Sequence, residues 1–192
     1  MRGIVLAVAL FAAASLAAAQ APDDRPAGPA VELRPFVGVY VPTGGMHQVM
    51  KGAPLFGTQV AYELRPSLHL LGAFTWIPST DKLHVSNTAV TILQSDVGVE
   101  VARVRRTSGG WEIKPFLGAG AGARTYRYGS PRLADATCAA GYGALGVEFQ
   151  WGATALRLEA RDYLYCFESP VAGGKTRTRS DVGLSAGVAF HF

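Results

Sequence analysis

Residues 84–87 read His-Val-Ser-Asn and contain two side chains whose types and spacing could support nucleophilic catalysis. Two positions apart on a strand, His84 and Ser86 would share a face, where the imidazole could take the hydroxyl proton. Such a pair needs an acidic partner in the right place. The fragment lies in a predicted loop, and Asp96 and Glu100 are predicted to point inward, away from it. We therefore interpret it as a polar loop segment and predict no enzyme.

Two other patterns look like ligand sites but lack the surroundings that such sites need. Gly141, Gly143 and Gly146 match G-x-G-x-x-G, yet no strand-to-helix turn surrounds them, so we predict no dinucleotide site. The other histidines are dispersed and share no ligand spacing: His47, His69 and His191. We predict no cofactor and no metal.

The two cysteines could form a disulfide. Cys138 begins one predicted strand and Cys166 ends the next, so a tight hairpin brings them close, and an oxidising compartment favours the bond. Strict alternation, however, places the two side chains on opposite faces and turns Asp162 outward. One β-bulge near Arg161 and Asp162 would correct both problems. The alternatives are two free thiols or pairing through flexible loop ends.

The elements that position these residues are predicted from alternation. From Val182 to Phe192, apolar side chains alternate with small or polar ones, which indicates a strand with two unlike faces. We count eight such segments after Ala30 and no convincing amphipathic helix. They span residues 31–41, 55–64, 68–77, 91–104, 113–126, 138–149, 153–165 and 181–192.

The connections between these segments alternate in length. Short turns are predicted at 65–67, 106–110 and 150–152, and long loops at 42–54, 78–90, 127–137 and 166–180. Short turns on one side and long loops on the other are typical of bacterial outer-membrane barrels. The predicted fold is all-β, an eight-stranded antiparallel up-and-down transmembrane barrel. A strand of about 11 residues tilted near 40° spans roughly 28 Å, close to the apolar band of about 25 Å.

Alternation assigns the apolar side chains of each strand to an outer surface that faces lipid. Aromatic residues are predicted to form two girdles at the water interfaces. One girdle, near the short turns, comprises Trp111, Phe149, Trp151, Phe190 and Phe192. The other, near the long loops, comprises Tyr40, Trp76, Tyr126, Tyr163 and Tyr165.

The opposite faces of the strands carry charges into the lumen. The predicted inward network comprises Glu63, Asp96, Glu100, Lys114, Arg124, Glu148, Arg157, Glu159, Arg161 and Asp181. A lone buried ion costs several kcal/mol, so we expect ion pairs and trapped water that fill the barrel and block a channel. A narrow ion path is the alternative. Gly118, Gly120 and Gly122 are expected to leave room for long charged side chains.

The predicted loops are basic. Their cations outnumber the acids Asp81, Asp135 and Glu168, and comprise Lys51, Lys82, Arg127, Arg132, Lys175, Arg177 and Arg179. Such a rim suits anionic lipopolysaccharide headgroups or another polyanion, and a solvated rim without a specific partner is the alternative. We expect no nucleic-acid partner.

The chain begins with targeting features. Residues 1–19 contain Arg2, an apolar stretch and Ala17-Ala18-Ala19, which predicts a cleaved signal peptide for secretion through the inner membrane. Residues 20–30 are Pro-rich and are interpreted as a flexible periplasmic leader, and residues 31–192 as the barrel. With 49% hydrophobic and only 17% charged residues, the composition favours a barrel surrounded by lipid.

Residues 31–192 resemble the small outer-membrane barrels of the OmpA and OmpX type. The resemblance depends on the signal sequence, the eight-strand pattern, the Pro-Phe-Leu-Gly-Ala-Gly-Ala-Gly segment at 115–122 and the terminal Phe192. It implies that the barrel-assembly machinery recognises the last strand through Phe190 and Phe192. Residues 84–87 are similar to the His-x-Ser-Asn of outer-membrane lipid A deacylases of the PagL type, but on a different part of the barrel.

The expected function is that of an integral outer-membrane barrel with a structural or surface-interaction role, whose loops contact lipopolysaccharide or an unknown extracellular ligand. The alternatives are a narrow, porin-like transport barrel, a PagL-like enzyme and a soluble lipocalin-like carrier. In the carrier, the valine and leucine positions would point inward.

Overall fold

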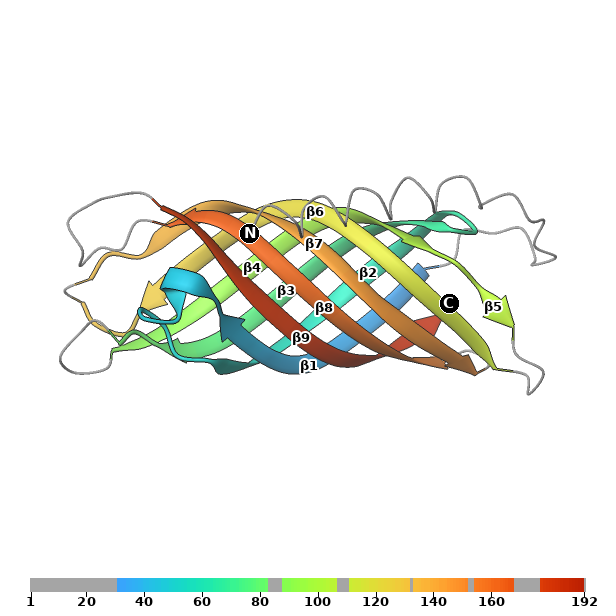
Figure 1. The fold of residues 1–192 in the computed structure, drawn as a ribbon, viewed down its shortest axis with the longest axis horizontal. Coiled ribbons are helices and arrows are strands. Elements are labelled where there is room, and N and C mark those ends of the chain that lie inside the picture. Colours follow the sequence, from blue (N-terminus) through green and yellow to red (C-terminus); the bar gives the residue numbers. More distant parts are fainter. Residues whose placement is uncertain are drawn as a thin grey trace.

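In a computed structural model, the chain forms a closed antiparallel barrel (Figure 1), which confirms the predicted fold class. The structure describes residues 31–82, 88–106, 111–131, 133–151, 154–167 and 177–191. The long strands are β1 (Val31–Pro42), β2 (Ala53–Arg65), β3 (Leu68–Thr80), β4 (Ala89–Ala102), β6 (Glu112–Tyr128), β7 (Ala136–Trp151), β8 (Thr154–Phe167) and β9 (Arg177–His191). Two short elements were not predicted: the 3₁₀ turn η1 (Gly44–Met46) and the two-residue strand β5 (Arg105–Arg106).

The barrel closes because each long strand pairs with its sequence neighbours and β1 pairs with β9. Starting at Val31, the register can be followed once around the wall to Val41, ten residues further along β1. The positions on this path are Val31, Tyr62, Leu70, Val99, Ala119, Gly143, Asp162, Val182 and Val41. This stagger tilts the strands by roughly 40°, because closure, strand spacing and rise per residue are linked.

The two ends of the barrel differ. At what we call the turn end, β2 and β3 are joined by two residues, Pro66 and Ser67. At the opposite loop end, the strands continue further than predicted: β4 and β6 still pair at Val90 and Tyr128. The alternation of apolar and polar residues ends earlier than the strands do. Beyond the lipid, backbone hydrogen bonds can continue a hairpin without an apolar face.

The outer face is apolar on every side of the barrel, as predicted. Leu184 and Phe190 of β9 are 46% and 41% exposed, whereas Arg157 and Glu159 of β8 are 5% and 7% exposed. The valine and leucine positions therefore face outward and the charges inward, which contradicts the lipocalin-like alternative. Within the described residues, no helix has the length and apolar character needed to cross a membrane.

The predicted girdle near the loop end is wrong in its orientation. Tyr40, Tyr126, Tyr163 and Tyr165 are all buried inside the barrel, and only Trp76 faces outward, where it contacts Phe56 with 5.6 Å between ring centroids. The tyrosines occupy the alternating positions that point into the lumen. Their predicted height along the strands, near the long loops, was correct, but their predicted place on the outer surface was wrong. At the turn end, Trp111, Trp151 and Phe190 are exposed and Phe149 is partly exposed, while Phe192 lies outside the described residues.

The connection between β1 and β2 folds back over the loop end. Its 3₁₀ turn begins at Gly44, whose φ of +53° suits a residue without a Cβ. The loop buries Met46, Val49 and Met50, which we call the loop plug, and Met50 forms a β-bridge with Asp81. An apolar cap therefore covers part of the barrel mouth (Figure 1).

Candidate functional site

The lumen is filled by two layers of side chains, which we call the ionic tier and the tyrosine tier. The ionic tier occupies the half of the barrel nearer the turn end. It comprises Glu32, Arg34, Asp96, Glu100, Lys114, Glu148, Arg157, Glu159 and Arg161, all of them buried. The tyrosine tier, nearer the loop end, comprises Tyr40, Tyr126, Tyr163 and Tyr165 around Arg124 and Asp181.

Glu100 of β4 lies at the centre of the ionic tier. Its carboxylate accepts hydrogen bonds from both Nη atoms of Arg157, and its Oε1 lies 3.1 Å from Nη1 of Arg34. The Arg157 guanidinium also stacks on Phe116, with 3.5 Å from its carbon to the ring centroid. One carboxylate thus joins β1 and β8 across the lumen, because the barrel is only wide enough for side chains to meet at its axis.

Glu159 of β8 links the arginines on either side of it. Its Oε2 lies 2.9 Å from Nη2 of Arg157, and its Oε1 lies 2.6 Å from Nη2 of Arg161. Arg161 continues to Asp96 of β4, with 3.3 Å between Nη1 and Oδ2. Gln59 donates its amide to Glu159 as well. Each buried charge therefore has opposite charges or donors around it, which offsets its desolvation.

The ionic tier ends near the turn end in a mixed group of acids and histidines. Glu32 accepts from Arg34 and lies 3.2 Å from Nε2 of His191 and 3.8 Å from Nε2 of His69. Glu148, paired with Lys114 at 3.6 Å, also lies within 3.8 Å of His191. Among the described residues, no group of three or more His, Cys, Asp or Glu side chains is arranged to hold a metal ion.

Arg124 and Asp181 form an isolated pair in the tyrosine tier. Both side chains are fully buried, with 3.0 Å between Nη1 and Oδ2. Tyr40 and Tyr165 donate their hydroxyls to the same carboxylate oxygen. The Arg124 guanidinium lies 4.6 Å from the Tyr165 ring centroid and 5.3 Å from that of Tyr163, within cation–π range. The aromatic rings therefore replace the counter-charges that surround the arginines of the ionic tier.

Tyr163 connects the two tiers. Its hydroxyl donates to Oδ2 of Asp96 at 2.8 Å and accepts from Nη1 of Arg161 at 3.3 Å. The two cavities described beside these layers have volumes of about 10 and 20 Å³. A water molecule needs about 10–15 Å³, so each cavity has room for little more than one water.

The lumenal glycines make room mainly for a tyrosine. A Cβ at Gly120 would collide with the Tyr142 ring and with the carbonyl oxygen of Val97, and one at Gly122 would collide with the Asp96 side chain. Tyr142 in turn supports Arg161, whose guanidinium carbon lies 4.3 Å from the ring centroid. We predicted that these glycines would leave room for long charged side chains, but the side chains that a Cβ at Gly120 or Gly122 would meet are the Tyr142 ring and the short carboxylate of Asp96.

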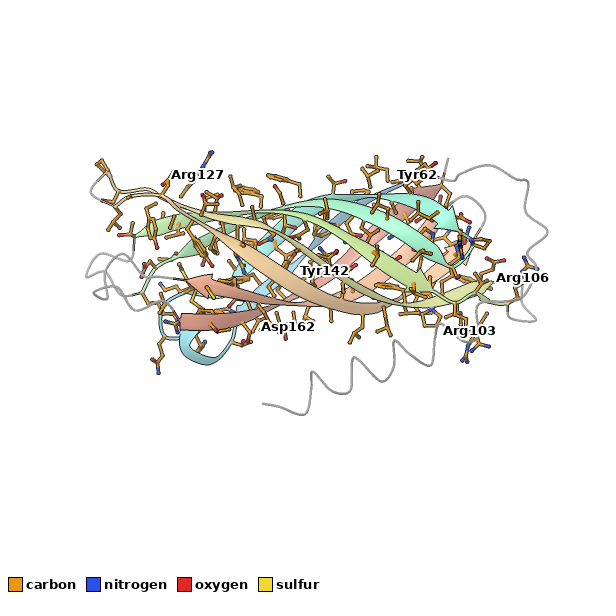
Figure 2. The ribbon with its side chains drawn as sticks, turned by 90° about the horizontal axis from the view of Figure 1, so that it is seen from above. Tyr62, Arg103, Arg106, Arg127, Tyr142 and Asp162 are labelled. Carbon is orange, nitrogen blue, oxygen red and sulfur yellow. The ribbon has the colours of Figure 1, made fainter. Side chains whose placement is uncertain are left out.

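The two cysteines are free thiols in the structure, so the predicted disulfide is not formed. Cys138 is partly buried and Cys166 is exposed on the outer face of β8. The register between β7 and β8 and between β8 and β9 is continuous through Asp162, without the bulge that we predicted. Asp162 consequently remains on the outer face, beside Gly143 and Val182 (Figure 2).

Four of the seven cations of the predicted basic rim can be placed with their side chains. Lys51 and Arg127 are exposed, Lys82 donates to the carbonyl of His47 at 2.8 Å, and the Arg179 guanidinium lies against Gly45. The backbone of Arg177 lies at the start of β9, and Arg132 and Lys175 fall outside the described residues.

The rim acids differ in their surroundings. Asp81 is fully buried beneath the loop plug, and Asp135 accepts a hydrogen bond from the Tyr128 backbone amide. Glu168 falls outside the described residues, and so do the His84 and Ser86 of the catalytic hypothesis. Among the rim charges that can be placed, Lys51, Arg127 and Asp135 are exposed, so exposed cations outnumber exposed acids.

Sequence reasoning missed two members of the ionic tier, Glu32 and Arg34. The signal was present, because Val31, Leu33 and Val37 alternate outward and leave positions 32 and 34 inward. Glu63, which we predicted in the network, is only half-buried and lies opposite His69 at the turn end.

Comparisons with solved structures agree with this geometry. Neisserial surface protein A superposes with a TM-score of 0.63 at 13% identity, covering 85% of this chain and 99% of that one. The N-terminal barrel domain of Pseudomonas aeruginosa OprF gives 0.51 at 15% identity, covering 85% and 97%. Ail, the attachment invasion locus protein of Yersinia pestis, gives 0.50 at 13% identity in its complex with the heparin analogue sucrose octasulfate, covering 86% and 99%.

No protein-family model matches the sequence, and no curated protein matches it either. At these identities the likeness concerns the fold. The fold is that of the small eight-stranded outer-membrane β-barrels, which confirms the resemblance to the OmpA and OmpX type at the level of architecture. Together with the apolar outer face, it supports an integral outer-membrane barrel protein.

Proposed function

We propose that this protein is a closed outer-membrane barrel that holds its loop end at the cell surface, in a structural or surface-interaction role. The observation that supports this most is that apolar side chains face outward and charged side chains face inward around the whole wall. Val37 of β1, Val97 of β4, Leu145 of β7 and Leu184 of β9 are each 46–67% exposed. A continuous apolar girdle of this extent exceeds what soluble monomers expose and needs acyl chains around it.

A closed interior follows from the two tiers. Charges that neutralise one another across the axis fill the lumen together with the loop plug, and the two cavities beside them measure only about 10 and 20 Å³. We therefore propose that the barrel conducts no ions, in preference to a transport role. Single-channel recording in a planar bilayer tests this: we expect no steps, and regular conductance would support the pore alternative.

The short turns of such barrels face the periplasm and the long loops face outward. In that orientation Lys51 and Arg127 would meet the anionic headgroups of lipopolysaccharide. Ail, a structural neighbour, was solved with a sulfated heparin analogue, which shows that a barrel of this shape is compatible with an anionic ligand at least in that protein. The assembly role of Phe190, which is exposed at the end of β9, remains part of the proposal.

Three measurements test membrane insertion, the outward orientation of the loop end and surface binding. Refolded protein that is inserted should migrate faster on a gel before heating than after heating, and its loop end should be cleaved by external protease in cells. Binding of purified lipopolysaccharide should weaken when Lys51 and Arg127 are both replaced by glutamine, and should remain when the cation at the other end, Arg103, is replaced. Unchanged binding in the first variant would contradict the proposed surface role.

A further inference from the structure

The turn end carries a second group of cations, which the surface role of the loops does not use. We call it the arginine strip: Arg65, Arg103, Arg105 and Arg106, all exposed. Figure 2 shows Arg103 and Arg106 at one end of the barrel and Arg127 at the other. Described residues 63–67 and 102–106 contain these four arginines and one acid, the half-buried Glu63, so positive charge predominates here.

The strip is one continuous surface because neighbouring turns are hydrogen bonded to each other. The amide of Ala102 donates to the carbonyl of Ser67 at 3.0 Å, which places Arg65 and Arg103 on adjacent turns. The amide of Arg103 donates to Pro115 of β6, and β5 then pairs with β6 through Arg105 and Ile113. The cations therefore lie side by side around one sector of the wall and not around the whole rim.

Two tryptophans next to the strip mark the depth at which it lies. Trp111 and Trp151 are 51% and 46% exposed, and their ring centroids are 5.5 Å apart. Exposed tryptophans of outer-membrane barrels lie at the level of the lipid headgroups. Glu112 pairs with Arg106 at 2.9 Å and offsets one positive charge, and three arginines of the strip remain to act on their surroundings at that level.

We propose that the arginine strip is a binding surface for the phosphate of an anionic glycerophospholipid, such as phosphatidylglycerol, in the leaflet at the turn end. A guanidinium donates two parallel hydrogen bonds to a phosphate, and the strip contains arginine only, without lysine. The tryptophan pair provides the apolar surface for the glycerol and the upper acyl chains. The inference depends on the proposed membrane insertion and adds a lipid preference to one sector of the barrel.

Fluorescence quenching by brominated lipids tests the proposal at the site itself. The chain has three tryptophans, so Trp76→Phe leaves Trp111 and Trp151 as local reporters. In phosphatidylcholine vesicles that contain brominated phosphatidylglycerol, we expect the reporters to indicate at least fivefold tighter binding of phosphatidylglycerol than of phosphatidylcholine. Replacing Arg65, Arg103 and Arg105 by glutamine should reduce this preference to about one, since each basic residue near a membrane contributes about fivefold.

Controls separate this proposal from the proposed function. Arg127→Gln, at the loop end, should leave the preference unchanged. Raising NaCl to 0.5 M should lower the preference for phosphatidylglycerol in the protein that retains all its arginines. This control does not depend on whether a variant folds. Equal quenching by the two lipids, or a preference that survives loss of the three arginines, would overturn the lipid site. Absence of quenching by brominated phosphatidylcholine would show instead that the barrel is not inserted, and would contradict the proposed function.

Discussion

The two halves of the lumen bury charge in different ways. In the ionic tier each group is shared: Glu100 contacts two arginines, and Glu159 contacts Arg157 and Arg161. In the tyrosine tier one pair, Arg124 and Asp181, is enclosed by aromatic rings and two hydroxyl donors. The comparison shows that a narrow barrel can offset the desolvation of ions either with a network or with a polarisable wall.

The difference has a consequence for mutation. In a network, removing one member leaves several others uncompensated, whereas an isolated pair can be removed as a unit. The ionic tier should therefore be sensitive to every single change, and the tyrosine tier should tolerate replacement of both partners together.

The largest expected effect is at the centre of the ionic tier. Glu100→Ala leaves Arg34 and Arg157 without their shared carboxylate, and we expect a loss of about 3–5 kcal/mol in the free energy of unfolding. Urea unfolding in lipid vesicles, followed by tryptophan fluorescence, measures this loss. Glu63→Ala, at a half-buried carboxylate of the same type, is the control and should change stability by less than about 1 kcal/mol. Equal losses would show that Glu100 is not central.

A double replacement separates the two tiers. Arg124→Met should destabilise the barrel by about 3 kcal/mol because the Asp181 carboxylate loses its cation, and adding Asp181→Asn should recover at least about 1 kcal/mol. In the ionic tier, Arg161→Met combined with Glu159→Gln should show no recovery, since Arg157 and Asp96 then lose partners too. The same unfolding assay measures both cycles, and recovery in the ionic tier would refute the contrast.

The loop plug should contribute stability without being the barrier to ions. Met50→Ala removes a fully buried side chain and should cost about 2 kcal/mol. We expect a planar bilayer with this variant to stay silent, because the ionic tier still fills the lumen. Conductance steps would show that the plug, and not the network, closes the barrel.

On the outer wall, the carboxylate of Asp162 interrupts the apolar pattern. Asp162→Leu should stabilise the inserted barrel by about 1 kcal/mol, since a carboxylate on a lipid-facing strand is unfavourable to a degree that depends on depth. Leu164→Asp, the reverse change two residues away on the same face, should destabilise it. A loss of stability in Asp162→Leu would show that the carboxylate has a partner in the membrane.

The smallest effect concerns the cysteines. Because Cys138 and Cys166 are unbonded, replacing both with serine should leave the heat-modifiable gel migration and the urea midpoint unchanged. Adding a reductant to the protein that retains both cysteines should also have no effect. A shift with reductant would indicate that the disulfide forms after all.

The sequence by itself determined the wall of the barrel. A period of two on eight segments assigns Leu184 and Arg157 to opposite faces without any knowledge of neighbours, because backbone pleating alone fixes that alternation. The same rule would have found Glu32 and Arg34, had it been applied to the start of the first strand. It also identified Cys138 and Cys166 as lying on opposite faces, and the bulge that we introduced to bring them together was an unnecessary correction.

Only the tertiary structure decided how the interior is filled. Which arginines meet Glu100, and that four tyrosines and the single acid Asp181 surround Arg124, depend on the ten-residue stagger that sets the heights of residues on distant strands. The folding of the β1–β2 loop over the mouth likewise depends on contacts with Asp81 and Arg179, which are far away in the sequence. Alternation gives the face of a residue but not its partners, because partners across a lumen are set by closure of the whole sheet.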